Sequence, residues 1–197
     1  VLILGDSLAS GYGVEPEAAF PALLQSKIDA RDLPFSVVNA GVSGDTSAGG
    51  LRRINWLLRR PVDILVLELG GNDGLRGVQP VTTRSNLQQI IERTREKYPR
   101  VKIVIAGMRM PDNMGEDFTR EFQEVFAGLA RANRAAFIPF LLEGVGGNPD
   151  LNQPDLIHPN AEGHGIVAEH VWGTLEPILT ELVDSAKNPA PTDELSN

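Results

Sequence analysis

The residues best suited to chemistry are a serine near the start of the chain and a histidine near its end. Ser7 follows the apolar run V-L-I-L and the pair Gly5-Asp6. A serine hydroxyl needs a neighbouring base to become a nucleophile at neutral pH, and His158 is the candidate base. Asp155 precedes His158 by three residues, so its carboxylate can reach back within one turn, hold the imidazole tautomer and stabilise the imidazolium. The pattern indicates nucleophilic catalysis.

Three groups can donate hydrogen bonds to the oxyanion that acyl transfer on Ser7 would generate. Ser7 and Gly44 can each offer a backbone N–H, and Asn72 can offer its side-chain amide. Gly44 has no side chain, so its backbone can come close to a substrate. The sequence therefore predicts an oxyanion hole formed by Ser7, Gly44 and Asn72.

Each of these residues also has an ordinary structural interpretation when it is taken alone. Ser7 can cap a helix or occupy a turn, and His158 can cap the last helix. Gly44, Asn72 and Asp155 are common residue types in turns. Their joint placement, after three successive strands and in one long loop, favours the catalytic interpretation.

The elements that must position these residues alternate between strand and helix. Strand patterns occur at residues 1–4, 35–39, 62–69, 101–106 and 136–139, and helix patterns at 16–30, between 46 and 61, and at 80–98, 118–133 and 161–184. This order predicts an α/β fold, a three-layer α/β/α sandwich with a five-stranded parallel sheet. Because ligands bind beyond the carboxyl ends of such strands, Ser7, Gly44 and Asn72 are expected at one edge, with the loop 141–157 closing over them.

Length and charge limit the possible partners. The 197 residues are expected to form one domain over 1–184, followed by a polar tail at 185–197 that is expected to be disordered. The net charge of −8 argues against a nucleic-acid partner. No stretch approaches 18 uncharged apolar residues, so no integral membrane segment is expected. No signal peptide is visible, and the abrupt start inside a strand leads us to expect a processed or trimmed N-terminus.

Residue types also limit the possible cofactors. The chain has no cysteine, which excludes a thiolate nucleophile and a cysteine-based metal site. Its three histidines lack zinc-protease spacing and no P-loop is present, so neither a metal nor another cofactor is expected. We expect His164 and His170 to face solvent or to serve packing.

Four blocks of the sequence resemble the SGNH hydrolases of the GDSL family. They are G-D-S-L at residues 5–8, the glycine at Gly44, G-G-N-D at 70–73 and D-L-I-H at 155–158. The blocks occur in the family's order over nearly the whole chain, and none of their residues departs from the pattern. The run G-G-N-D-G-L-R-G at 70–77 further resembles the bacterial thioesterase, lysophospholipase and arylesterase branch.

The resemblance implies a flavodoxin-like SGNH hydrolase fold and a serine hydrolase of carboxylic esters and thioesters that needs no cofactor. It also implies a small acyl ester or thioester as the partner and a periplasmic or secreted location. The alternatives are a carbohydrate deacetylase on the same fold, a metallophosphoesterase that a chelator would inactivate, and a non-catalytic binding module. A binding module is expected to have lost Ser7 or His158, and both are present.

Two loops are candidates for binding an acyl chain. The loops at 74–79 and 107–114 follow the third and fourth strands and carry apolar residues that are unusual in loops, namely Leu75, Val78, Met108, Met110 and Met114. Methionine is flexible and adapts to irregular apolar surfaces, which suits the wall of an acyl groove. Packing in the core is the alternative for the three methionines.

Overall fold

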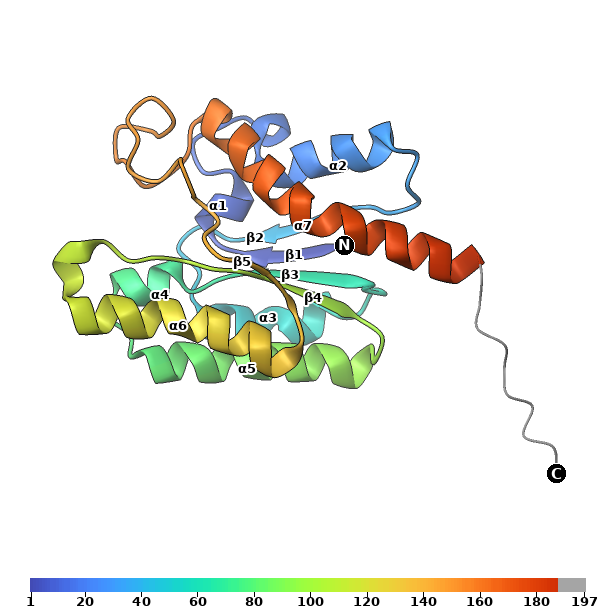
Figure 1. The fold of residues 1–197 in the computed structure, drawn as a ribbon, viewed down its shortest axis with the longest axis horizontal. Coiled ribbons are helices and arrows are strands. Elements are labelled where there is room, and N and C mark those ends of the chain that lie inside the picture. Colours follow the sequence, from blue (N-terminus) through green and yellow to red (C-terminus); the bar gives the residue numbers. More distant parts are fainter. Residues whose placement is uncertain (188–197) are drawn as a thin grey trace.

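The computed structural model describes residues 1–187, and its centre is one parallel sheet (Figure 1). The strands are β1 (Leu2–Gly5), β2 (Val38–Gly41), β3 (Ile64–Glu68), β4 (Lys102–Ala106) and β5 (Ala136–Ile138). They are ordered β2-β1-β3-β4-β5, so the first strand lies inside the sheet between β2 and β3. All neighbouring pairs are parallel, which confirms the predicted sheet.

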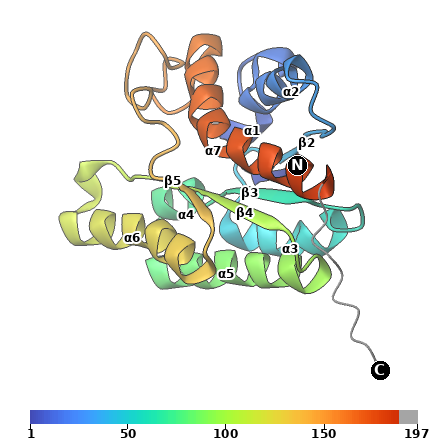
Figure 2. The same ribbon diagram turned by 45° about the vertical axis from the view of Figure 1, so that its right-hand side comes forward.

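Helices cover both faces of the sheet (Figures 1 and 2). One face carries α2 (Phe20–Ala30) and α7 (Ala161–Lys187), and the other carries α3 (Ser47–Leu57), α5 (Pro80–Lys97) and α6 (Glu116–Asn133). Four short segments complete the described part: α1 (Ser7–Ser10), α4 (Gly71–Leu75) and the 3₁₀ turns η1 (Pro16–Ala18) and η2 (Asp112–Met114). None of the helices in residues 1–187 is long and apolar enough to cross a membrane.

The core forms where the apolar runs of the sequence become central strands. Every residue of β1 and β3 is buried, as expected for strands that are covered by helices on both faces. Ile3 pairs with Val66 and Leu4 with Leu67, so these aliphatic side chains stack in register across the sheet. The helices add their apolar stripes, for example Phe122 and Phe126 of α6, which pack edge to face.

Several boundaries differ from the sequence prediction, and the first predicted helix, 16–30, is divided into the 3₁₀ turn η1 and α2, which begins at Phe20. The second strand begins at Val38 rather than at residue 35, and its first two residues are exposed because β2 is an edge strand. The one-turn helices α1 and α4 have no counterpart among the predicted helices, because four or five residues show no helical period. The last helix continues to Lys187, three residues past its expected end, and the remainder of the predicted tail lies outside the described residues.

The two faces of α3 predict different sensitivities to mutation. Ile54→Ala should lower the free energy of unfolding by about 2–5 kcal/mol, because Ile54 is fully buried and its loss leaves a cavity. Trp56→Ala is the control on the same helix, and its 65% exposed side chain should contribute less than about 1 kcal/mol. Urea denaturation measures both values, and equal losses in the two variants would contradict this packing.

Candidate active site

The structure brings Ser7, His158 and Asp155 into one hydrogen-bonded chain. Ser7 Oγ lies 2.9 Å from His158 Nε2, and His158 Nδ1 lies 2.7 Å from Asp155 Oδ2. The serine comes from the carboxyl end of β1, whereas the other two residues come from the loop between β5 and α7. This arrangement allows His158 to take the hydroxyl proton while Asp155 holds the other ring nitrogen.

A tight turn at residues 155–158 brings the Asp155 carboxylate to the His158 ring. The Oδ1 atom of Asp155 accepts the N–H groups of Ile157 (2.9 Å) and His158 (3.0 Å), which leaves Oδ2 for the imidazole. Leu156, between them, adopts a left-handed conformation with φ of 59°, which is uncommon for a residue with a branched side chain. The backbone hydrogen bond from His158 and the imidazole contact lower the pKa of Asp155 to about 2, so Asp155 is ionised at neutral pH.

Two side chains that precede the turn, those of Asn152 and Gln153, hold the loop in place. Asn152 forms an isolated bridge with Pro159 and donates to backbone oxygens at Val145 and Asn148. Gln153 Nε2 donates to Tyr12 O at 2.6 Å, which joins the histidine loop to the segment after α1. The ring of Tyr12 in turn lies 4.6 Å from the His158 ring. The base therefore has a fixed orientation before substrate binds.

The nucleophile begins a one-turn helix. Asp6 Oδ1 accepts the Leu8 N–H at 3.0 Å and so caps α1, whose first residue is Ser7. Asp6 Oδ2 accepts Asn72 Nδ2 at 3.1 Å and so orients the amide of the expected oxyanion donor. One buried carboxylate therefore fixes the positions of Ser7 and Asn72 together.

The Gly44 loop is fastened to the helix that carries Asn72. Gly44 has φ of 76°, a left-handed conformation that favours glycine, and its carbonyl accepts Arg76 Nη2 at 3.0 Å. Arg76 is the residue that ends α4, the helix that carries Asn72. The loop after β2 and the helix after β3 are thus joined to each other, and the oxyanion hole of Ser7, Gly44 and Asn72 stays a prediction.

Asp73 joins α4 to the first turns of α3 and α5. Its buried carboxylate accepts the Ser47 N–H at 2.8 Å and the hydroxyls of Ser47 and Thr83. Ser47 is the first residue of α3, where the helix dipole favours a negative charge. Asp6 and Asp73 thus both accept backbone N–H groups and fix the local backbone on either side of the site.

Sequence reasoning did not find Glu68, which pairs in register with Gly5, two residues before the nucleophile. Glu68 ends β3, is fully buried and accepts the Asp6 N–H through Oε2 at 3.1 Å. Burial raises the pKa of Glu68 well above its usual range, and burial also raises the pKa of Asp6 to about 6. The signal was present, because a glutamate inside the otherwise aliphatic run at 64–69 contradicts a strand buried on both faces.

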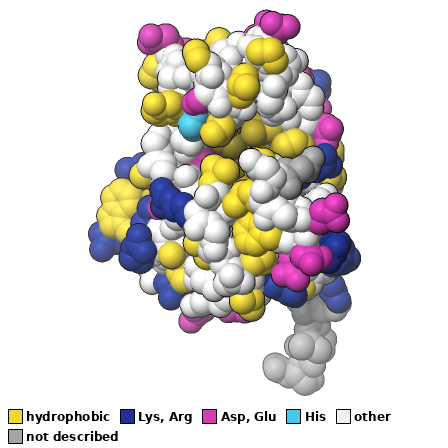
Figure 3. All heavy atoms as spheres, turned by 90° about the vertical axis from the view of Figure 1, so that its left-hand side faces the viewer, with side chains coloured by type: hydrophobic (Ala, Val, Ile, Leu, Met, Phe, Trp, Pro, Cys, Tyr) yellow, Lys and Arg dark blue, Asp and Glu magenta, His cyan; other side chains and the backbone are white. Residues whose placement is uncertain are grey.

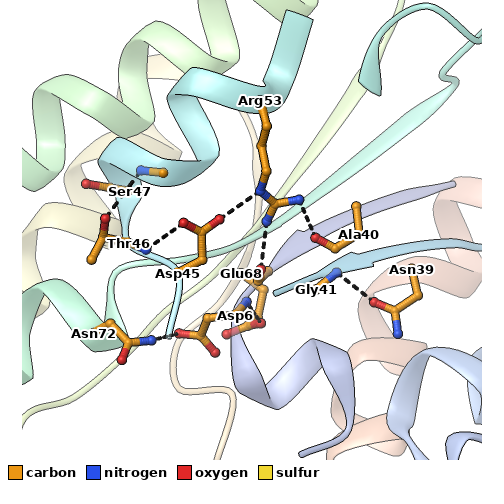
Figure 4. A network of polar contacts seen from close by, with 12 residues as sticks. Asp6, Asn39, Ala40, Gly41, Asp45, Thr46, Ser47, Arg53, Glu68 and Asn72 are labelled. Atoms are coloured by element: carbon orange, nitrogen blue, oxygen red, sulfur yellow. Dashed lines mark hydrogen bonds and ion pairs between the residues drawn. The ribbon is translucent and has the colours of Figure 1, made fainter. Parts of the chain in front are cut away.

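A guanidinium holds the backbone around this acid (Figure 4). Arg53 of α3 donates to the carbonyl oxygens of Ala40 (2.6 Å) and Gly5 (2.9 Å), which end β2 and β1. Its third contact is an ion pair with Asp45 at 2.7 Å. Arg53 therefore fixes the ends of two strands just before the catalytic loops begin.

The predicted acyl-groove residues fall into two groups. Met108 and Met110 belong to the core, with 3% and 8% exposure, and a Cβ atom on Gly74 would come within 2.2 Å of Met110 Sδ. They therefore offer a ligand little surface. Met114 and Val78 are half-buried, whereas Leu75 on α4 is 46% exposed. Of the five candidates, Leu75 has the most accessible position.

The other two histidines serve packing. His164 is buried and stacks on Phe20, whose N–H it accepts through Nδ1 at 3.3 Å. Burial lowers the pKa of His164 to about 4, so its ring is neutral at neutral pH. His170 Nδ1 lies 3.2 Å from the Leu141 carbonyl oxygen. In residues 1–187, no cluster of three histidine or acidic side chains is arranged to hold a metal.

Comparison with known proteins places this geometry in a family. Residues 3–166 match the GDSL-like lipase/acylhydrolase family. The chain belongs to this family. The GDSL chain is 39% identical over 181 residues to the esterase TesA of Pseudomonas aeruginosa, an alignment that covers 91% of this chain and 89% of TesA. It is 40% identical over 181 residues to the thioesterase 1/protease 1/lysophospholipase L1 of Escherichia coli K12, covering 91% and 84% of the two chains.

Solved structures agree with this assignment. The crystal structure of a TesA superposes with a TM-score of 0.85 at 38% identity, over 90% of this chain and 98% of that one. The esterase EstA of a Pseudoalteromonas species, solved with the inhibitor monoethylphosphonate, gives a TM-score of 0.84 at 30% identity, over 91% and 97% of the chains. The fold is that of the SGNH hydrolases.

The histidines provide a matched test of the GDSL site. His158→Ala should lower kcat on an ester substrate by roughly 10⁴–10⁶-fold, because Ser7 loses the group that accepts its proton. His170→Ala should leave kcat within about threefold, because the His170 ring hydrogen-bonds the Leu141 carbonyl oxygen and none of the three catalytic residues. Steady-state kinetics measures both. An active His158→Ala enzyme would contradict the assignment of the base.

Proposed function

We propose that this enzyme hydrolyses carboxylic esters and thioesters through an acyl-enzyme on Ser7. The observation that carries the proposal is the 2.9 Å contact between Ser7 Oγ and His158 Nε2, continued at 2.7 Å to Asp155. Ser7 attacks the acyl carbon while His158 takes its proton, and the ionised Asp155 stabilises the imidazolium. His158 then gives that proton to the departing alcohol or thiol, and the acyl group stays on Ser7.

The second half of the reaction uses the same groups. Water loses a proton to His158 and attacks the acyl-enzyme, and the proton returns to Ser7 as the acid leaves. Both halves pass through a tetrahedral oxyanion, which would accept hydrogen bonds from the N–H groups of Ser7 and Gly44 and from the Asn72 amide. The hydrogen bonds that Asp6 accepts from the Leu8 N–H and the Asn72 amide support this placement of donors, since they fix Ser7 and Asn72.

The relatives support the ester and thioester substrate class. The Pseudomonas protein is named an esterase and the Escherichia protein a thioesterase and lysophospholipase. The phosphonate inhibitor of EstA is of a chemical type that reacts with activated serines, which fits a serine nucleophile in that relative.

The surroundings of Ser7 favour an apolar acyl group. Exposed large hydrophobic side chains lie on the segments that carry the site, and they are Tyr12, Val42, Leu75, Leu156 and Ile157. Figure 3 shows the side of the molecule that lies to the left in Figure 1, where hydrophobic side chains adjoin a histidine at the surface. Each buried methylene of a substrate would contribute at most about 0.8 kcal/mol on such a surface. We infer that Leu75, rather than Met108 or Met110, contributes to binding of the acyl chain.

A panel of p-nitrophenyl esters from acetyl to palmitoyl, with an acyl-CoA series beside it, tests the substrate class. We expect kcat/KM to rise from acetyl to mid-length chains and then to level off. Leu75→Ala should flatten the rise and leave acetyl turnover unchanged. Val81→Ala, an exposed apolar residue on α5, is the matched control and should keep the wild-type profile.

Two results would contradict the proposal. Efficiency that is highest at acetyl and falls steadily would favour the carbohydrate deacetylase. Absence of turnover across both series would reject ester and thioester hydrolysis as the activity.

A further inference from the structure

Glu68 is a buried acid that the reaction described above does not use. It is fully buried, and its Oε1 atom has no hydrogen-bond partner among the described residues. The cation nearby in Figure 4, Arg53, forms its ion pair with Asp45 instead. Burying a carboxylate without a cation costs folding free energy. The presence of Glu68 therefore suggests that it has a functional role.

The local packing is arranged around the Glu68 carboxyl. Glu68 pairs in register with Gly5, and a Cβ atom on Gly5 would come within 2.2 Å of Glu68 Oε2. Glycine at this place in the G-D-S-L block therefore leaves room for the acid. Gly5 directly precedes Asp6 and lies two residues before Ser7, so the Glu68 carboxyl lies close to the start of the catalytic segment.

Glu68 touches the catalytic machinery through Asp6. Glu68 Oε2 accepts the Asp6 N–H at 3.1 Å, which places the two buried carboxyls beside each other. Asp6 in turn caps the helix of Ser7 and orients the Asn72 amide. The contacts form one path from Glu68 to the nucleophile and to an oxyanion donor.

Two neighbouring buried carboxyls cannot both ionise without strong repulsion, so they share one proton. Asp6 accepts from Leu8 and Asn72, which favours its ionised form, whereas Glu68 lacks such donors on Oε1. The shared proton therefore resides on Glu68. Burial and the Asp6 charge both raise the pKa of Glu68, in agreement with this assignment.

We propose that Glu68 is a positioning residue that acts as a neutral carboxylic acid. It accepts the Asp6 N–H and donates its proton to the Asp6 carboxylate, and so holds Asp6 where it fixes both Ser7 and Asn72. The inference rests on the proposed acyl transfer at Ser7. Its effect is expected in the transition state, because Asn72 and the Ser7 N–H serve the oxyanion rather than the bound substrate.

Two substitutions separate the neutral acid from other roles. Glu68→Gln keeps an acceptor for the Asp6 N–H and a donor for the Asp6 carboxylate, so kcat and KM should stay within about threefold of wild type. Glu68→Leu keeps the bulk and removes both hydrogen bonds. It should lower kcat about 10–100-fold, less than complete removal of an oxyanion donor, with KM within about twofold.

A matched control addresses general destabilisation. Thr94→Val replaces another fully buried polar group by an apolar one, on α5, where the Thr94 hydroxyl donates to the Ile90 carbonyl oxygen. This variant should lose thermal stability without loss of kcat. The rate of Ser7 phosphonylation by a fluorophosphonate, measured below each melting temperature, gives a second readout that does not depend on the choice of ester.

Thermal melting against pH tests the protonation state. An acid whose pKa is raised by folding destabilises the protein as pH rises above the unfolded value, so wild type should lose stability there and Glu68→Gln should lose less. The melting-temperature difference, variant minus wild type, should therefore grow from pH 5 to pH 9. The other charged groups around the acid pair are the same in both proteins, and they are Arg53, Asp45, Asp73, Asp155 and His158.

Three outcomes would overturn the proposal. Glu68→Gln as inactive as Glu68→Leu would show that the ionised acid is needed. Glu68→Leu with wild-type kcat and phosphonylation rate would show that Glu68 positions nothing. A melting-temperature difference that falls with pH would show that ionised Glu68 stabilises the fold. A wild-type enzyme inactive on every ester and thioester but still phosphonylated at Ser7 would reject the proposed substrates and leave the phosphonylation test of Glu68 intact.

Discussion

The structure depends on the 2.9 Å hydrogen bond between Ser7 Oγ and His158 Nε2, which joins residues 151 positions apart in the chain. Ser7 is fixed because β1 lies inside the sheet, between β2 and β3, with its backbone end held by Arg53. His158 is fixed because its loop begins after β5, ends at the start of α7 and is fastened to Tyr12 through Gln153. A parallel sheet makes this meeting possible, since the strand ends that carry the donors lie at one edge.

The need to position Ser7 and Asn72 explains why the core contains two buried acids, Asp6 and Glu68, next to the nucleophile. Asp6 and Glu68 are both buried, and burial raises the pKa of each, so they cost stability as pH rises from about 4 towards neutrality. Local rules of folding are most often broken at functional sites, where the strain serves the chemistry. Leu156, in its left-handed conformation at the turn of the triad, is a second case of the same kind.

Much of this architecture could be predicted from the sequence, because aliphatic runs such as 62–69 and helical stripes such as that of α6 are strong local signals. The meeting of Ser7, Asp155 and His158 followed from their positions at strand ends and in one loop. The helices α1 and α4 are too short to show a helical period. Asp6 caps α1, and Asp73 joins α4 to the first residue of α3. Met110 is buried because it packs against Gly74, and Glu68 reaches Asp6 because it pairs with Gly5. Both contacts join residues far apart in the sequence, so local patterns do not predict them.

The central claim is that Ser7 is acylated with its oxyanion held by the Ser7 and Gly44 N–H groups and the Asn72 amide. A crystal structure of the enzyme after reaction with a phosphonate tests it most directly, because the phosphoryl oxygen stands in for the oxyanion. The account predicts phosphorus bonded to Ser7 Oγ and its free oxygen within about 2.7–3.1 Å of all three donors. Phosphorus on another residue, or a phosphoryl oxygen that points away from Gly44 and Asn72, would contradict it.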